Sequence, residues 1–296
     1  RLGIANPNSN LVYADNLNGG GIWLAPIYKN HDSDEFDAQG VDYGADIDLY
    51  GVALGADFTT DSGVRVGAYF NVGSGDADGQ GVGSDVSNDF DYFGLGLYAG
   101  KTFGNFNFIA DAGFTQVSND IDQSVNYHGV GKITADTDTT AVTVGLRGEY
   151  KFETQFVDIT PHLGVRYTNL DMDSYDAKLD GQVVATTDAD NMQIFSIPFG
   201  VSFAKEFTAG EWSVKPVFDL TLTANAGDTD FDTDTTFIGV EGLSLSTEVL
   251  DDFTYGGTLG VSAEYGDSLG FGINVHYVGS DAADEFGVTG NIRYMF

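Results

Sequence analysis

Cysteine is absent from the 296-residue chain, and basic residues are scarce, with 12 Lys and Arg against 45 Asp and Glu. Without cysteine the chain can form neither a disulfide scaffold nor a thiolate metal site, and it can cross an oxidising compartment unfolded. The formal net charge of −33 argues against nucleic acid as a partner, because binding to phosphates requires clustered Lys and Arg. Only five Pro occur beside 40 Gly, 22 Phe and 15 Tyr, a composition that suits many strands joined by turns.

Long hydrophobic runs are also missing. No stretch of 18 apolar residues occurs, so the sequence predicts no transmembrane helix. A membrane location remains open, because the strands of a membrane barrel alternate polar and apolar residues and keep the mean hydropathy near zero, here −0.10. No signal peptide or initiator Met is present, and we interpret Arg1 as the start of a fragment or of a processed product.

The last eleven residues, from Phe286 to Phe296, form the most informative segment. With a period of two, apolar and aromatic residues occupy one face, and mostly polar residues occupy the other. The apolar face carries Phe286, Val288, Gly290, Ile292, Tyr294 and Phe296. A soluble protein seldom ends in so apolar an edge strand, because unpaired edges aggregate. In a closed barrel this edge is sealed against the first strand and the outer face meets lipid.

Alternating segments are joined in turn by a tight turn and by a long polar connection. The tight turns are 61–63, 104–105, 153–155, 208–210 and 266–268. The long connections are 30–48, 73–91, 118–138, 169–191, 225–252 and 279–285. Eleven connections imply twelve strands, with both chain ends on the side of the tight turns. The sequence therefore predicts an all-β fold, a 12-stranded antiparallel transmembrane β-barrel with short periplasmic turns and long acidic extracellular loops.

A soluble β-sandwich or propeller is the alternative fold, since its strands also alternate. Its core would be dense in Val, Ile and Leu. Here aromatic residues such as Phe103 and Phe106 cluster at strand ends beside the tight turns, which is typical of an interfacial girdle and favours lipid. The alternation is irregular near Trp23 and Tyr50, and a β-bulge at either place would explain it.

Most of the acidic residues lie in the six long connections. Solubility and self-repulsion are one interpretation of this charge. Loose Ca²⁺ binding is a second, because Asp230, Asp232, Asp234 and Glu241 occupy positions one, three, five and twelve of an EF-hand loop. Position six is Thr235 rather than Gly, and no flanking helix is expected, so a true EF-hand is not predicted.

The basic residues of the strands take the inward phase together with several acids. An Arg or Lys that faces lipid at mid-depth costs about 2–4 kcal/mol, which explains the inward orientation. The predicted lumen-lining residues are Arg65, Asp111, Arg147, Asp158, Arg166, Lys215, Asp219, Glu264 and Arg293. Their ion pairs can brace the interior, and the same residues can line a hydrated pore that holds a segment of chain.

Five stretches match, in order and spacing, the pattern of a known family. They are Gly19-Gly20-Gly21-Ile22-Trp23, residues 49–58, Ile197-Pro198-Phe199-Gly200, Lys215-Pro216-Val217-Phe218-Asp219 and Arg293-Tyr294-Met295-Phe296. Together they resemble the translocator (β) domain of the monomeric autotransporters of type V secretion. The resemblance covers essentially the whole chain from about Gly19.

This resemblance implies an outer-membrane translocator and anchor that secretes an N-terminal passenger to the cell surface. It implies that residues 1–20 are the remnant of a lumenal helix or linker and that residues 21–296 form the barrel. The barrel assembly machinery would recognise the C-terminal strand through Val288, Ile292, Tyr294 and Phe296. Expected partners are outer-membrane lipid, lipopolysaccharide, this machinery and the passenger segment in the lumen. A monomer in the bacterial outer membrane is expected, with no cofactor, metal or catalytic residue.

Two other functions stay open at the level of sequence. A twelve-stranded channel for small solutes is one, and the inward cations would suit anionic solutes. The sequence upstream of Arg1 would separate this function from passenger secretion. An outer-membrane hydrolase is the other, suggested by the neighbours His31 and Asp32. No Ser-His-Asp spacing in the chain demands catalysis.

Overall fold

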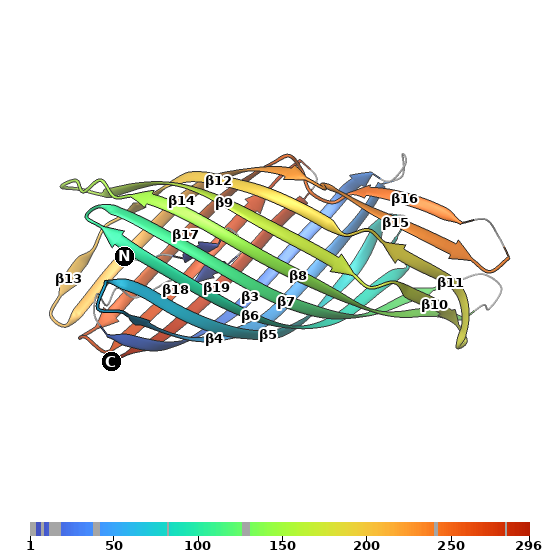
Figure 1. Cartoon of the computed structure of the whole chain (residues 1–296), viewed down its shortest axis with the longest axis horizontal. Coiled ribbons are helices and arrows are strands. Elements are labelled where there is room, and N and C mark those ends of the chain that lie inside the picture. Colours follow the sequence, from blue (N-terminus) through green and yellow to red (C-terminus); the bar gives the residue numbers. More distant parts are fainter. Residues whose placement is uncertain are drawn as a thin grey trace.

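The computed structural model describes residues 4–6, 9–11, 19–37, 42–81, 83–125, 131–239, 242–281 and 283–296. Twelve antiparallel strands form a closed barrel (Figure 1), as the sequence predicts. In chain order the barrel strands are β3 (Gly20–Asp37), β4 (Asp42–Thr59), β5 (Val64–Gly81), β6 (Val86–Phe103), β7 (Phe106–Ser124), β8 (Lys132–Tyr150), β9 (Asp158–Met172), β12 (Met192–Ala204), β14 (Trp212–Gly227), β17 (Phe253–Tyr265), β18 (Leu269–Gly279) and β19 (Ala283–Met295). Within the described part of the chain, no helix has the length and apolar character to span a bilayer.

The barrel closes between β3 and β19, the first and last strands of the ring. Trp23 lies opposite Arg293 across this seam. Gly20 and Phe296 exchange two backbone hydrogen bonds of 2.9 Å, which tie the end of the chain to the first barrel strand. Each strand of the ring therefore has a neighbour on both sides, and the membrane region has no open edge.

Five turns join strands at the end of the barrel where the C-terminus lies (left in Figure 1). Four of them contain a glycine with positive φ, a conformation that other residues rarely adopt. These glycines are Gly63, Gly104, Gly210 and Gly266. The turn between β8 and β9 is wider and is closed by a bridge between Phe152 and Ile159. The sequence-based prediction of five turns at these places is confirmed. A short strand, β13 (Phe207–Ala209), leads into the turn before β14.

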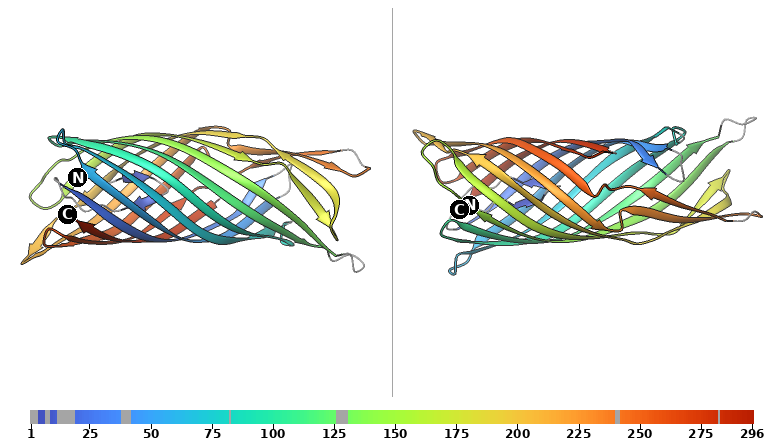
Figure 2. Two further views of the ribbon diagram at one scale, coloured as in Figure 1. Left: turned by 60° about the horizontal axis from the view of Figure 1, so that its bottom comes forward. Right: turned by 90° about the horizontal axis from the view of Figure 1, so that it is seen from above.

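At the opposite end the sheet continues well beyond the barrel (right in Figure 1; Figure 2). The added strands are β10 (Tyr175–Leu179), β11 (Gln182–Ala189), β15 (Asp230–Phe237) and β16 (Leu243–Glu248). They pair in the order β8–β10–β11–β15–β16. Most of residues 30–48, 73–91 and 118–138 also belong to β3–β8. The prediction of long loops over these residues is therefore wrong in extent. The acidic residues alternate with Thr, Ala, Ser and Gly, which is the pattern of a strand whose charged face meets water.

We call the part of the sheet beyond the barrel, formed by these added strands and the adjoining ends of β3–β8, the extension. Within it, five aspartates on neighbouring strands lie directly opposite one another. Asp48 of β4 pairs with Asp76 of β5, which pairs with Asp89 of β6. Asp89 pairs with Asp120 of β7, which pairs with Asp136 of β8. We call this row the aspartate ladder. Like charges in directly opposite positions destabilise a sheet, so the backbone pairing of the extension forms against side-chain repulsion.

Apolar and aromatic side chains cover the outer face of the barrel. On β6, Phe93, Leu95, Leu97 and Phe103 are 40%, 53%, 64% and 59% exposed. From Phe93 to Phe103 the strand rises about 33 Å, which at a tilt of about 40° spans about 25 Å along the barrel axis. This height equals the apolar band of outer-membrane barrels. The outer face therefore suits lipid rather than water.

The pairing of β3 with β4 is regular along the membrane region. Among the described residue pairs of β3 and β4, the register shifts between Ser33 and Phe36. The β-bulge predicted near Trp23 or Tyr50 is therefore wrong. Trp23 is 2% exposed and faces inward, while Tyr50 is 53% exposed and faces outward. One large aromatic residue on the inner face, rather than a slipped strand, produces the irregular pattern near Trp23.

Aromatic rings on the inner face lean along the wall over glycines of the next strand. A Cβ at Gly55 of β4 would come within 2.3 Å of the Trp23 ring. A Cβ at Gly67 of β5 would come within 2.2 Å of the Tyr98 ring. The missing side chains provide the space that these rings occupy. The buried apolar cluster of the barrel, formed by Trp23, Ala25, Ala53, Tyr98 and Ile109, thus includes rings that lie against the inner wall.

Replacing Gly55 with alanine is expected to destabilise the barrel, because the new methyl group must displace the Trp23 ring. We expect a loss of about 1–3 kcal/mol in the free energy of unfolding, measured by urea titration in lipid vesicles. Gly257→Ala is the matched control, since its nearest atoms would lie 3.8 Å from the new Cβ. Equal stability of the two variants would contradict the prediction.

Two short strands precede the barrel. β1 (Ile4–Asn6) and β2 (Ser9–Leu11) pair antiparallel to each other. They lie inside the barrel (dark blue in Figures 1 and 2). The first barrel strand begins at Gly20. The division of the chain into a lumenal remnant, 1–20, and a barrel, 21–296, stays a prediction.

Candidate functional site in the barrel interior

Charged side chains on the inner face pair along the wall. Arg166 of β9 donates from Nη2 to both carboxylate oxygens of Asp111 on β7, at 2.8 and 3.0 Å. Gly145 of β8 lies between them, and a Cβ there would come within 2.6 Å of the carboxylate and 2.8 Å of the guanidinium. The pair crosses directly over the middle backbone, which only glycine allows. One ion pair thus joins three strands.

His162 of β9 and Asp219 of β14 repeat this arrangement across β12. His162 Nε2 lies 2.9 Å from Asp219 Oδ2. A Cβ at Gly200, on the strand between them, would come within 2.8 Å of the imidazole ring. The carboxylate also accepts hydrogen bonds from the hydroxyls of Ser202 and Thr221. These contacts hold Asp219 against the wall and satisfy its oxygens.

The most deeply buried charges lie at the seam between β19 and β3. Arg293 donates to both carboxylate oxygens of Asp57 on β4, from Nη1 at 2.8 Å and also from Nη2. Tyr98 Oη donates to the same carboxylate at 2.7 Å and accepts from Trp23 Nε1 at 3.0 Å. Arg65 Nε lies 3.7 Å from Asp57 Oδ1. All five side chains are at most 5% exposed, so this cluster excludes water from the seam.

A second group of charged and polar side chains lies at the same seam, nearer the extension. Lys29 Nζ of β3 lies 2.9 Å from Glu285 Oε1 of β19. His276 Nε2 of β18 lies 3.0 Å from the same oxygen. A Cβ at Gly287 would come within 2.0 Å of the imidazole ring, so this pair too lies against the wall. The group links β18, β19 and β3.

The other lumen residues predicted from sequence lie on the inner face or at its rim. Arg147 Nε is 2.7 Å from Glu149 Oε1 of its own strand. Asp158, beside the β8–β9 turn, has Lys205 Nζ at 3.4 Å and Lys151 Nζ at 3.5 Å. The predicted residues that remain, Lys215 and Glu264, lie on the adjacent strands β14 and β17.

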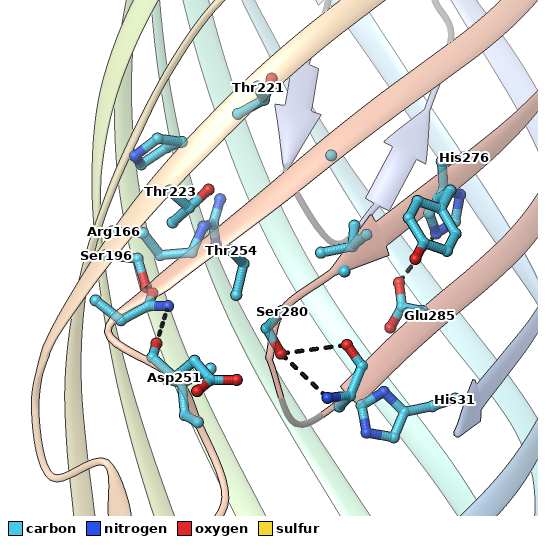
Figure 3. A pocket seen from close by; sticks show the side chains of 18 of the residues that line it. His31, Arg166, Ser196, Thr221, Thr223, Asp251, Thr254, His276, Ser280 and Glu285 are labelled. Carbon is cyan, nitrogen blue, oxygen red and sulfur yellow. Dashed lines mark hydrogen bonds and ion pairs between the residues drawn. The ribbon is translucent and has the colours of Figure 1, made fainter. Parts of the chain in front are cut away.

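A cavity of about 410 Å³ lies inside the barrel towards the extension (Figure 3). Arg166 and His276 approach it from opposite sides. Among the described residues, Arg166 Nη1 and His276 Nδ1 are buried without a hydrogen-bond partner. Threonine and serine hydroxyls supply much of the remaining polar lining, including Ser196, Thr221 and Thr223. The cavity therefore offers polar contacts to a segment of chain inside the barrel.

Sequence reasoning missed Asp57, Trp23, Tyr98 and Glu285 as interior residues. Asp57 lies on the strand whose phase is irregular near Tyr50, and Glu285 falls in a segment that the sequence assigns to a loop. A usable signal was present in β4, where the small residues at 53 and 55 precede Asp57 at a period of two. Small residues on an inward phase indicate that larger side chains from the next strand lie above them.

The residues predicted to form the assembly signal lie on the outer face of β19. Ile292, Tyr294 and Phe296 are 51%, 51% and 70% exposed, and Val288 is half-buried. The rings of Tyr294 and Phe296 are 6.4 Å apart. They extend the apolar belt to the end of the chain. Their recognition by the assembly machinery stays a prediction.

No group of three or more His, Asp and Glu in the described ranges is arranged to hold a metal ion. Asp230, Asp232 and Asp234 lie along β15, about 6.6 Å apart on one face, and so do not converge as EF-hand ligands do. Glu241 lies outside the described residues. His31 and Asp32, the basis of the hydrolase interpretation, are consecutive in β3 and point to opposite faces.

A closed ring of twelve strands with an apolar outer band and paired charges inside defines an outer-membrane β-barrel. Within this class, the model of the autotransporter beta-domain family matches residues 22–284. The chain belongs to this family, whose members are translocator barrels rather than a class of enzyme, and it lies in the bacterial outer membrane. The family resemblance noted in the sequence is confirmed.

Solved structures agree with this assignment at the level of fold. The translocator domain of the autotransporter NalP from Neisseria meningitidis aligns with a TM-score of 0.73 and 13% identity, covering 95% of this chain and 90% of that one. The beta domain of the Bordetella autotransporter BrkA aligns with a TM-score of 0.67 and 20% identity, covering 94% of this chain and 100% of that one. The transport unit of the autotransporter AIDA-I from Escherichia coli aligns with a TM-score of 0.65 and 12% identity, covering 93% of this chain and 90% of that one. No curated protein matches the chain in sequence.

Proposed function

We propose that this barrel carries a passenger segment through its lumen to the cell surface and then anchors it in the outer membrane. The position of β1 and β2 carries the proposal. These strands precede the first barrel strand and lie inside the barrel (Figure 2). A polypeptide joined ahead of them would already be threaded into the pore. The translocator domains named above support the same role.

The inner wall supports this function because its large polar groups lie along it. The Asp111–Arg166 and His162–Asp219 pairs cross over glycines instead of reaching across the lumen. The cavity beside them has unpartnered polar atoms on Arg166 and His276. An extended chain needs partners for its backbone amides and carbonyls, and these groups and the nearby hydroxyls can provide them.

The outer surface supports a proposal for the partners and the assembly state. We propose that the barrel assembly machinery binds the C-terminal strand, with Val288, Ile292, Tyr294 and Phe296 as its contacts. The apolar belt would meet lipid, and the charged extension above it would meet the lipopolysaccharide headgroups. One chain closes the whole ring, so each strand is already paired and a monomer is sufficient.

A reporter fusion tests the proposed function. A signal peptide and a small epitope-tagged domain are placed ahead of Arg1, and surface exposure is measured by protease digestion of intact cells. We expect the reporter to become digestible from outside while the barrel stays protected. A reporter that carries a disulfide, and so cannot unfold, is the matched control and is expected to remain periplasmic until it is reduced.

A correctly folded barrel that leaves the unlocked reporter in the periplasm would overturn passenger secretion. Conductance measurements in planar bilayers then distinguish the channel function that the sequence left open. Selective passage of small anions without reporter display would favour that channel, with the cations around the cavity as its selectivity groups.

A further inference from the structure

We propose that the buried Asp57–Arg293 pair sets the register in which β19 closes against β3, so that Arg293 is a positioning residue for barrel closure. The pair lies at the seam of the ring, with Asp57 4% and Arg293 1% exposed. A buried ion pair adds little net stability compared with apolar residues, and fixing one register is its best-attested use. The inference concerns the closed barrel itself and does not depend on passenger secretion.

The seam is the one interface of the ring that lacks a connecting segment. Every other neighbouring pair of barrel strands is joined by a turn, by β13 and its turn, or by a hairpin of the extension. In such pairs the turn restricts the register. β3 and β19 stand at opposite ends of the chain, so their side chains must specify how they meet.

The outer face of the seam cannot specify it. Ile22 and Leu24 of β3 are 50% and 42% exposed, and Ile292 and Tyr294 of β19 are each 51% exposed. A slip of two residues keeps these apolar side chains facing lipid, because the side-chain period of a strand is two. Lipid contact is therefore almost the same in the native register and in either slipped one.

The inner face does distinguish the registers. Arg293 lies opposite Trp23, and Asp57 lies opposite Gly21, two residues before Trp23 on β3. The guanidinium passes over Gly21, where a Cβ would come within 2.7 Å of Arg293 Nη2. A slip that places Arg293 opposite Ala25 moves it about 7 Å further from Asp57. The carboxylate is then buried without its bidentate partner, which disfavours this register.

The opposite slip is disfavoured by the end of the chain. It places Arg293 opposite Gly21 and Met295 opposite Gly19, which precedes the first residue of β3. The two hydrogen bonds between Gly20 and Phe296 are then lost. Only the native register keeps both the Gly20–Phe296 hydrogen bonds and the contact between Arg293 and Asp57.

Disulfide cross-linking of the full chain, refolded into lipid vesicles, measures the register directly, because the sequence has no cysteine of its own. Leu24→Cys with Ile292→Cys reports the native register, in which these residues are opposite. Leu24→Cys with Tyr294→Cys and Ile22→Cys with Ile292→Cys report the two slips. Opposite residues have Cβ atoms about 4.5–5.5 Å apart, near disulfide range, whereas diagonal residues are about 7–8 Å apart, with Cβ atoms somewhat closer than that but beyond disulfide range.

With the native pair, only the first reporter is expected to cross-link. In Arg293→Met and Asp57→Asn, we expect native cross-linking to fall at least threefold and slipped cross-links to appear. Arg166→Met is the matched control, because it breaks the equivalent pair with Asp111 away from the seam and should leave a single register. The double variant Asp57→Asn/Arg293→Met separates register from stability: it should fold better than Arg293→Met yet still give mixed registers.

Native cross-linking alone in the folded Asp57→Asn and double variants would overturn the proposal. A double variant that does not fold would also overturn it, since the pair would then be needed for stability rather than for register. Slipped cross-links in Arg166→Met at the same yield would show that any lost ion pair loosens the seam, and would count against a specific role of Arg293.

Discussion

Replacing Phe296 with aspartate is expected to reduce accumulation of the folded barrel in the outer membrane at least tenfold. Phe296 is 70% exposed at the lipid boundary, and its backbone makes two hydrogen bonds to Gly20 that a substitution leaves possible. A charged side chain near the membrane interface costs only about 0–1 kcal/mol, which is too little to unfold the barrel. A large loss would therefore reflect failed recognition of the C-terminal strand during assembly.

The matched control is Phe103→Asp, which places the same charge at the same end of the barrel but away from the C-terminus. Phe103 is 59% exposed and flanks the turn before β7. We expect this variant to insert at a level close to that of the unaltered chain. Heat-modifiable migration on gels and protease protection measure insertion. Normal insertion of Phe296→Asp, or an equal defect in Phe103→Asp, would contradict a role for Phe296 as an assembly signal.

The extension above the membrane is expected to lose order at low ionic strength. The cause is the aspartate ladder, whose neighbours lie directly opposite each other. Two unit charges about 5 Å apart in water repel by about 1 kcal/mol, and salt screens this repulsion. Among the described residues, the ladder's three central members, Asp76, Asp89 and Asp120, have no ion-pair partner. Amide hydrogen exchange in residues 73–91 should therefore be several-fold faster in 10 mM than in 500 mM salt.

Acidification should act in the same direction as salt. Partial desolvation and then the neighbouring carboxylates of Asp48, Asp78, Asp89 and Asp46 raise the pKa of Asp76 above its usual 3.8. A carboxyl whose pKa is raised by folding favours the folded state most when it is protonated. The contribution is present below pH 3.8 and is lost as the pH rises through the raised value. The extension is thus expected to be more ordered near pH 4 than at pH 7.

Asp89→Asn tests the ladder, because it removes the charge that faces both Asp76 and Asp120. Exchange at low salt should slow in β5, β6 and β7, and its dependence on salt should weaken. Asp61→Asn changes net charge equally in a turn at the other end of the barrel and should leave exchange in the extension unchanged. Equal effects of the two variants would assign the salt dependence to net charge rather than to the ladder.

The strand count and the five turns could be predicted because both depend on local pattern. A strand that is wet on one side alternates, and a tight turn needs glycine or a short polar sequence. The phase of the C-terminal strand was equally clear, since Phe296 and Tyr294 share a face with Ile292. These features need no knowledge of what lies on the neighbouring strand.

The extent of the extension and the seam cluster could not be predicted for the opposite reason. Acidic residues between turns look like loop, and only cross-strand pairing shows that Asp76 and Asp89 belong to strands. Trp23 faces inward because Gly55 on the next strand leaves room for it. Asp57 gains its partner from Arg293, 236 residues away in the chain. Such contacts depend on strand pairing and, for Asp57, on barrel closure, which local sequence does not encode.

Because the inner wall holds its Asp111–Arg166 and Asp57–Arg293 ion pairs flat along its surface, a polypeptide crossing the lumen as proposed above would meet charges that are already paired. Arg166 is paired with Asp111, and Arg293 with Asp57, each within hydrogen-bond distance. Under the proposed function, such a wall would favour release of the passenger over its retention.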